Sequence, residues 1–227
     1  GQISLTLWQE QINSVKIGDT IDVTGALYAW GAGATGRLGD GTTIDKSSPT
    51  LIPTGIAPSS WKIIASGFGI NNGHTFAIRN SDSTLWAWGY NRIVNGQSSQ
   101  YVDVSDATNR SSPIQITTTQ DYSNAISDGY TVLGLKLNGS VWAWGYNIYG
   151  QLGQGDTINR SSPVQVMSGS FVSISAGYGN TSAAISTNGT LWTWGFNGVS
   201  GPLGTADTIY RSSPVQVAVQ VGFSSVS

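Results

Sequence analysis

Side chains able to do acid–base chemistry are few in this chain of 227 residues. It contains one histidine, His74, and one glutamate, Glu10. A glycosidase built on two glutamates is therefore excluded within the chain, although a pair of aspartates remains open. No partner set of serine and aspartate recurs around His74, so we interpret it as a structural hydrogen-bonding residue rather than a catalytic base. We predict no enzyme.

An aspartate precedes an arginine by four residues at three places, each time shortly before a Ser-Ser-Pro sequence. The three pairs are Asp106–Arg110, Asp156–Arg160 and Asp207–Arg211. Recurrence favours a structural ion pair or loop clamp over a single active site. The first copy has Thr42 and Lys46 at these positions, so we expect its clamp to be weaker or absent. A calcium loop is the alternative, but the run lacks the alternating oxygen ligands of such loops. We predict no metal site.

Composition excludes several further classes. The formal net charge is −2, charged residues make up 10% of the chain, and no run of Lys or Arg offers a phosphate-tracking surface. The absence of cysteine excludes disulfides and thiolate metal sites. The Gly-rich segment 33–43 lacks the Gly-Lys-Ser/Thr ending of a phosphate loop. No apolar run has the length of a membrane span. We therefore expect no cofactor, no nucleic acid and no membrane span.

Internal repeats dominate the organisation of the chain. A Trp-Gly step recurs at Trp30, Trp88, Trp144 and Trp194, at intervals of 50 to 58 residues. Ser-Ser-Pro sequences ending at Pro49, Pro113, Pro163 and Pro214 follow in the same order. Such a period indicates a repeat architecture. The expected repeats are approximately 8–60, 61–121, 122–170 and 171–222, with the start of another at 223–227.

Each repeat is expected to be a succession of short strands. In the fourth repeat, β-branched, aromatic or alternating residues occupy 171–177, 181–186, 191–196 and 213–217. Asn188-Gly189 between two of these segments predicts a hairpin, and Asn138-Gly139 repeats the pattern. No segment shows a sustained helical period. Most Asn-x-Ser/Thr triplets lie at equivalent turns, where turn chemistry explains them; glycan attachment is the alternative.

The Trp-rich segments are predicted to be strands with two unlike faces. Trp86 and Trp88 lie on one face of such a strand, whereas Leu85 and Ala87 lie on the other. Sheets stacked so that the large face meets the small face would fill the space between them. We therefore interpret the tryptophans as structural core rather than a ligand-stacking surface. The set comprises Trp30, Trp86, Trp88, Trp142, Trp144, Trp192 and Trp194.

The segment 141–166, VWAWGYNIYGQLGQGDTINRSSPVQV, resembles the repeat of the regulator of chromosome condensation family, and GHTFAI at 73–78 resembles the segment upstream of it. The resemblance covers nearly the whole chain. It implies an all-β fold, a β-propeller of four-stranded blades, usually seven in number. At about 50 residues each, the chain holds about four blades. We therefore expect a partial or open propeller, part of a longer array or paired with other chains through its open ends.

One segment departs from the repeats. The Trp-to-Pro interval is longest in the second repeat, where residues 90–109 lack the Gly-Gln-Leu-Gly turn. Loops on a rigid scaffold often carry binding function, so we predict contacts from this segment, with a neutral insertion as the equal alternative. The residues are Tyr90, Arg92, Tyr101 and Asp103.

These observations predict a non-enzymatic, structural or protein-binding β-propeller module that forms homo- or hetero-oligomers. The near-identical repeats and the neutral surface rich in Ser, Thr and Asn favour a virion component of a bacteriophage or an extracellular bacterial protein; a cytoplasmic location stays open. The family resemblance also implies an alternative, a guanine-nucleotide-exchange or chromatin-type regulator. The acidic balance and the lack of a basic arm count against that alternative.

Overall fold

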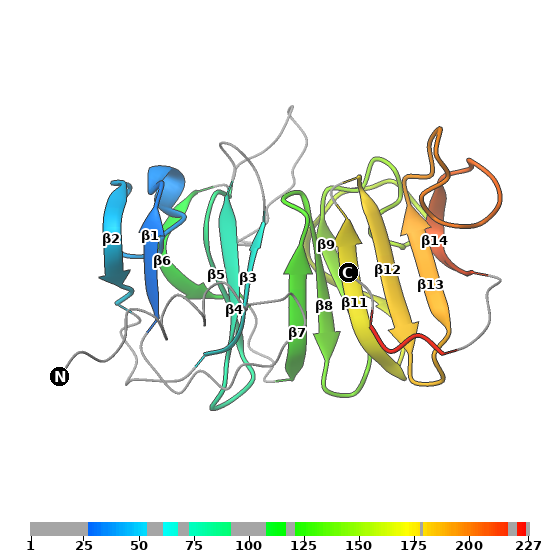
Figure 1. Ribbon diagram of the computed structural model, residues 1–227, viewed down its shortest axis with the longest axis horizontal. Helices are drawn as coiled ribbons and strands as arrows, with labels where there is room; N and C mark the ends of the chain where they lie inside the picture. The colour runs from blue at the N-terminus through cyan, green and yellow to red at the C-terminus, as the bar shows by residue number, and fades with distance from the viewer. Residues whose placement is uncertain are drawn as a thin grey trace.

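The computed structural model describes residues 27–53, 61–67, 73–91, 108–116, 121–177, 179–217 and 222–225. Their strands form one two-stranded and three four-stranded antiparallel sheets, which we call blades 1 to 4 (Figure 1). Blade 1 contains β1 (Tyr28–Gly31) and β2 (Lys46–Leu51), with a short 3-10 helix, η1 (Ala34–Gly36), between them. Blade 2 contains β3 (Trp61–Gly67), β4 (His74–Arg79), β5 (Leu85–Gly89) and β6 (Arg110–Gln115). Blade 3 contains β7 (Tyr122–Ser127), β8 (Thr131–Lys136), β9 (Val141–Gly145) and β10 (Arg160–Met167). Blade 4 contains β11 (Phe171–Gly177), β12 (Thr181–Ser186), β13 (Leu191–Gly195) and β14 (Arg211–Gln216).

Within each four-stranded blade, the strands pair in chain order as a meander. β7, the first strand of blade 3, contacts β3 and β11, the first strands of blades 2 and 4. The blades therefore stand side by side with their first strands adjacent (Figure 1). This confirms the predicted all-β fold of four-stranded propeller blades. The described residues contain no helix with the length and apolar character to cross a membrane.

The strand boundaries in blade 4 follow from local backbone geometry. β13 ends at Gly195, one residue before the expected end, because this glycine has φ 102°, outside the range of a regular strand. β14 begins at Arg211, two residues early, because Arg211 pairs with Gly195 across a shift in register. At the Asn188-Gly189 turn, Gly189 N–H donates to the Ser186 carbonyl at 2.9 Å and Gly189 has φ 78°. The expected hairpin is present, with the glycine supplying the left-handed position.

Neighbouring blades pack a large aromatic face on a small aliphatic face. Leu85 and Ala87 of β5 share a buried cluster with Trp144 of β9, and the Phe76 and Trp144 rings meet edge to face at 5.9 Å. At the next junction the small face of β9 packs in the same way on blade 4, against Trp194. The second tryptophan of each full blade is buried, whereas Trp30 in blade 1 is 41% exposed. The first tryptophans, Trp86, Trp142 and Trp192, are partly buried.

The outermost strand of each blade carries the proline of a Ser-Ser-Pro sequence. These prolines, Pro49, Pro113, Pro163 and Pro214, lie in β2, β6, β10 and β14, and the register of each outer pair shifts nearby. Proline has no N–H to offer to a further strand. The motif therefore protects the exposed edge of each blade from unwanted pairing.

Candidate functional site

Long connections between the third and fourth strands of the blades lie together at one end of the molecule. In blades 1, 3 and 4 they are residues 32–45, 146–159 and 196–210, which lie at the top of Figure 1. We call this end the loop face. The antiparallel sheets fix the ends of these connections. Exposed side chains on the loop face can therefore vary without disturbing the core.

Most of the segment singled out from sequence lies outside the described residues. This holds for Arg92, Tyr101, Asp103 and Asp106. Tyr90 is described: its N–H donates to the Gly73 carbonyl at 3.0 Å, and its side chain packs against the apolar cluster between blades 2 and 3. Tyr90 therefore has a packing contact within the protein.

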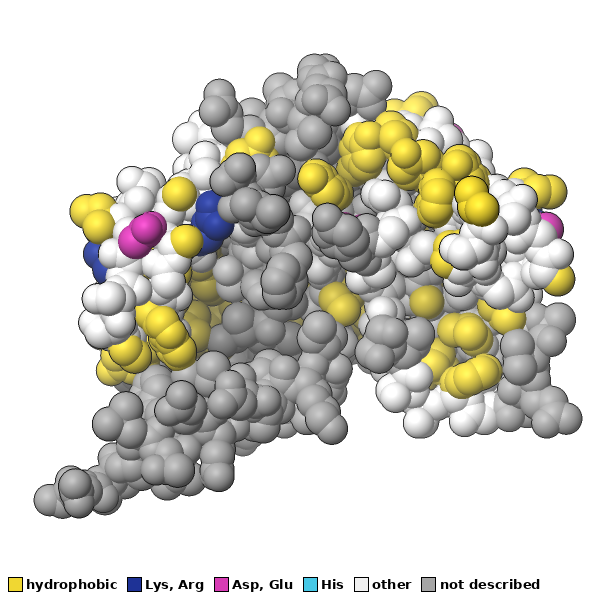
Figure 2. Space-filling model, turned by 45° about the horizontal axis from the view of Figure 1, so that its top comes forward, with side chains coloured by type: hydrophobic (Ala, Val, Ile, Leu, Met, Phe, Trp, Pro, Cys, Tyr) yellow, Lys and Arg dark blue, Asp and Glu magenta, His cyan; other side chains and the backbone are white. Residues whose placement is uncertain are grey.

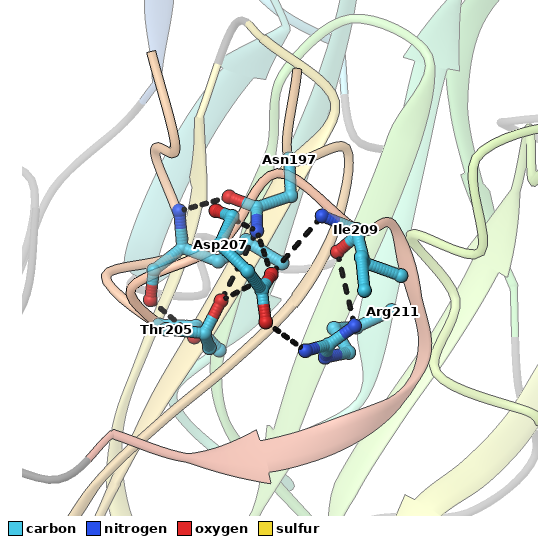
Figure 3. Close-up of polar contacts among 7 residues, drawn as sticks. Asn197, Thr205, Asp207, Ile209 and Arg211 are labelled. Carbon is cyan, nitrogen blue, oxygen red and sulfur yellow. Dashed lines mark hydrogen bonds and ion pairs between the residues drawn. The ribbon is translucent and has the colours of Figure 1, made fainter. Parts of the chain in front are cut away.

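Each loop on blades 3 and 4 is organised by a buried asparagine and an aspartate. In blade 4, Asn197 Nδ2 donates to the Asp207 carbonyl at 2.9 Å and to Asp207 Oδ1 at 3.0 Å, and Asn197 Oδ1 accepts the Leu203 N–H at 3.0 Å (Figure 3). Arg211 Nη2 donates to Asp207 Oδ2 at 2.5 Å, and Ile209 N–H donates to Oδ1 at 3.0 Å. The Asp–Arg pair thus joins the loop to the outer strand.

Blade 3 repeats the arrangement. Arg160 Nη2 donates to Asp156 Oδ2 at 2.6 Å, and Asn147 Oδ1 accepts the Leu152 N–H at 2.8 Å. The N–H of Ile158, and then the Arg160 guanidinium, hold the pKa of Asp156 below its ordinary value. For Asp207 the N–H of Ile209 is likewise the first cause of a lowered pKa. These carboxylate oxygens are occupied by N–H donors, which argues against the calcium alternative.

Blade 1 keeps the clamp with a displaced acid. Thr42 has no carboxylate, but Asp40, two residues earlier, pairs with Lys46 at 3.1 Å and accepts the Thr42 N–H at 3.0 Å. The clamp, expected to be weaker or absent here, is therefore present with a different acid, since Asp40 pairs with Lys46. No group of three or more histidine or acidic side chains placed to hold a metal occurs in the described part of the chain.

Two of the Asn-x-Ser/Thr triplets provide turn chemistry within these loops. Asn159 Oδ1 accepts the Asn147 N–H at 2.7 Å, and Asn109 Oδ1 accepts the Asn91 N–H at 2.9 Å. In blade 1, Asp45 Oδ1 accepts the Gly33 N–H at 2.8 Å. The repeated position therefore closes the base of the loop with a side-chain oxygen.

An aromatic cluster joins the loops of blades 3 and 4. The Tyr149 ring meets Phe196 edge to face at 5.1 Å and Tyr210 at 5.5 Å, and Phe196 and Tyr210 are 4.9 Å apart. Nearby on the loop face, Tyr130 and Tyr146 are 6.2 Å apart. Desolvation, followed by the neighbouring tyrosines, raises the pKa of Tyr146 above its ordinary value. Tyr146 therefore presents its ring and a neutral hydroxyl group.

Aliphatic side chains widen this cluster into an exposed apolar patch. Tyr210 is 47% exposed, Ile209 62% and Val199 fully exposed. Figure 2, with the loop face turned forward, shows hydrophobic side chains gathered over blades 3 and 4. The nearby charges are already paired as Asp–Arg clamps. We call the set Tyr130, Tyr146, Tyr149, Phe196, Ile209 and Tyr210 the aromatic patch. Contiguous exposed apolar surface marks interaction sites.

His74 has a buried serine partner that the sequence analysis missed. Its Nε2 lies 2.8 Å from Ser127 Oγ, across the junction between blades 2 and 3, and the two residues are 53 positions apart. Both are buried, and Ser127 Oγ also accepts the Gly129 N–H at 3.1 Å. The adjacent Asp128 carboxylate accepts from Tyr130 and Thr131 N–H groups. The pair therefore acts as a hydrogen bond between blades.

The aromatic patch was also missed from sequence. Tyr149, Phe196 and Tyr210 do not share one repeat position, and their clustering depends on how two blades stand relative to each other. The only sequence pattern pointing to it is the aromatic residue after Trp-Gly, Tyr146 and Phe196 in blades 3 and 4.

Comparison with known families identifies the repeat. The family model described as the regulator of chromosome condensation (RCC1) repeat matches residues 24–78 and 138–184, and a second model of that repeat matches 171–200. The ultraviolet-B receptor UVR8 of Arabidopsis thaliana is 30% identical over 152 residues, 64% of this chain and 32% of that protein. The E3 ubiquitin-protein ligase HERC2 of Homo sapiens is 31% identical over 137 residues, 58% of this chain and 3% of that protein.

Solved structures show the same fold. Human WBSCR16 aligns with a TM-score of 0.69 at 23% identity, covering 87% of this chain and 49% of that one. A chain in the structure of Kap60 bound to yeast RCC1 (Prp20) aligns with a TM-score of 0.68 at 19% identity, covering 92% and 49%. The chain spans about half of these structures and about a third or less of the curated relatives.

Proposed function

Because this chain belongs to the family of β-propellers built from regulator of chromosome condensation repeats, we propose that it is a protein-binding propeller segment whose contact surface is the aromatic patch. One observation carries the proposal: on the loop face the Tyr149, Phe196 and Tyr210 rings are in contact, with Tyr210 47% exposed, beside two Asp–Arg pairs. Tyrosine and phenylalanine anchors of this kind dominate binding energy at protein interfaces.

The chemistry of the patch defines the partner it fits. The rings and neutral hydroxyls offer apolar contact and hydrogen bonds, but little net charge for steering an acidic or basic partner. We infer a partner surface with apolar anchors and uncharged hydrogen-bonding groups. Association should therefore depend only weakly on ionic strength.

A displayed library of random peptides, selected on the intact chain, tests this function. We expect selected peptides to lose affinity by about tenfold or more for a Tyr149→Ser, Tyr210→Ser double variant. The matched control, Leu137→Ser with Val172→Ser, removes side chains that are 60% and 51% exposed at the opposite end of the blades. Peptides that bind the loop-face variant normally and lose affinity for the control would contradict the proposal.

For the biological setting, we propose a non-enzymatic structural component of a phage virion or an extracellular bacterial surface. The low charged fraction, 10%, supports this, as does the near-identity of the repeats. An antibody raised against the chain should label purified particles or intact, unpermeabilised cells of the source. Labelling confined to the soluble fraction of lysed cells would contradict this setting.

A regulator of a small GTPase or of chromatin is the second candidate. It is favoured by the fold shared with Prp20p, whose structure was described together with its binding to Gsp1p and histones. Acceleration of nucleotide release from Gsp1p by the chain would support this candidate, whereas unchanged release together with patch-dependent peptide binding would favour the structural module.

A further inference from the structure

The turn between the third and fourth strands of one blade packs on the tryptophan of the next blade. In blade 3, the Gln151 carbonyl accepts Trp194 Nε1–H at 2.9 Å and Ser182 Oγ–H at 2.8 Å. Gly153 lies so close to the indole that a Cβ there would be 2.9 Å from Trp194 Nε1. A second backbone contact follows, from Gly155 N–H to the Ser212 carbonyl at 2.6 Å.

Blades 1 and 2 meet in the same way. A Cβ on Gly39 would be 2.6 Å from Trp88 Nε1, and Gly41 N–H donates to the Ser111 carbonyl at 2.7 Å. Trp88 and Trp194 are both buried. The repeated contact is therefore a defined interface, with a glycine turn on one side and a tryptophan and a serine carbonyl on the other.

Blade 4 presents the turn side of this interface with no described residue packed on it. Leu203 N–H is held by Asn197 Oδ1 at 3.0 Å, as Leu152 N–H is by Asn147 in blade 3. Gly204 has φ 70°, equal to that of Gly153, and among the described residues a Cβ on it would meet only Val217 Cγ1, at 3.6 Å. The turn 201–204 is thus already in the conformation that receives a tryptophan.

Blade 1 presents the complementary side. Trp30, at the position of Trp88 and Trp194, is 41% exposed, and its strand neighbour Tyr28 is 36% exposed. Ser47, at the position of Ser111 and Ser212, is also exposed. The chain therefore displays both halves of an interface that it forms twice internally.

We propose that this chain binds a second copy of itself head to tail, with Trp30 of one copy packed on the turn 201–204 of the other. Following the internal interfaces, Trp30 Nε1–H donates to the Pro202 carbonyl, and Ala206 N–H donates to the Ser47 carbonyl. Ala206 has φ 59°, matching the left-handed glycines at 41 and 155 that make this second contact internally. The chain covers 49% of each propeller chain that it resembles, so two copies supply about one full propeller.

Sedimentation velocity on the full chain and two single variants tests the proposal. We expect the wild type to have twice the mass of one chain. Trp30→Ala removes the tryptophan side of the interface. Gly204→Asn places a side chain where Trp30 would pack, and asparagine is chosen because it tolerates a left-handed backbone. Each should weaken self-association by roughly 30-fold or more.

Mixing the two variants is the decisive measurement. The Gly204→Asn variant keeps Trp30, and the Trp30→Ala variant keeps the turn 201–204. An equimolar mixture should therefore form one-to-one complexes, although each variant alone is monomeric. Tyr210→Ser, in the aromatic patch and outside this interface, should assemble like the wild type. A monomeric wild type, or a mixture that does not associate, overturns the proposal. Peptide binding at the aromatic patch is measured separately, so either proposal can fail alone.

Discussion

Asp128 is a buried carboxyl group at the end of β7, and its ionisation opposes folding. Its Oδ1 accepts N–H groups of Tyr130 and Thr131 at 2.8 and 2.7 Å, but burial outweighs these bonds and raises the pKa to about 6, from 3.8. Between pH 3.8 and about 6, Asp128 is mostly protonated in the folded chain and mostly ionised in the unfolded chain. The free energy of unfolding should therefore rise as the pH falls from 7 to 5.

Asp128→Asn keeps an oxygen for the two N–H groups and removes the ionisation. We expect the variant to lose the rise between pH 7 and 5, a difference of about 1 kcal/mol. Urea unfolding at each pH measures it. Asp82 is the control, because the bond from Arg79 lowers its pKa to about 2 and the carboxylate stays ionised from pH 7 to 5. Asp82→Asn removes this pairing and should lower stability by a similar amount at pH 7 and at pH 5, which leaves the rise between them in place. An unchanged slope in Asp128→Asn would contradict the prediction.

The hairpins between the second and third strands place one residue in the left-handed region. Gly139 and Gly189 have φ 77° and 78°, but blade 2 has Ser83 there, at φ 55°. A side chain in this conformation is strained, whereas glycine adopts it readily. Ser83→Gly should raise the free energy of unfolding by about 0.5–1 kcal/mol, measured by urea unfolding.

The reverse change at the equivalent turn is the matched control. A Cβ on Gly139 would lie 2.7 Å from the Ser170 backbone nitrogen, so Gly139→Ala should destabilise the protein by more than about 1 kcal/mol. Equal and small effects of both substitutions would show that the turn carries no strain.

The blades are held together across the whole molecule by the tryptophans at their junctions. Trp144 is 1% exposed and contacts the small face of blade 2, whereas Trp30 is 41% exposed. Trp144→Ala should lower the free energy of unfolding by about 3–5 kcal/mol. Trp30→Ala should cost much less at dilutions where the chain is monomeric. Urea unfolding at low protein concentration compares them, and equal losses would place Trp30 in the core.

Repeat period, strand alternation and turn chemistry are local in sequence, and they were sufficient to predict a repeat architecture of short strands. The propeller itself was implied by the resemblance of residues 141–166 to the family repeat. Leu85 and Ala87 alternate with Trp86 and Trp88, so the two unlike faces of a blade could be inferred from one strand. Asn188-Gly189 likewise marks its hairpin because the required backbone conformation is a property of the glycine itself.

Contacts between blades were decided only by the tertiary structure. Tyr149 meets Phe196 and Tyr210, and His74 meets Ser127, because blades standing side by side bring together residues that share no sequence pattern. Exposure of the tryptophans was also decided by the tertiary structure. Trp30 and Trp194 have the same repeat position, but Trp194 is buried under the turn at Gly153, whereas Trp30 is 41% exposed. Sequence therefore specified how one blade is built, and the stacking of blades determined which surfaces remain available for binding.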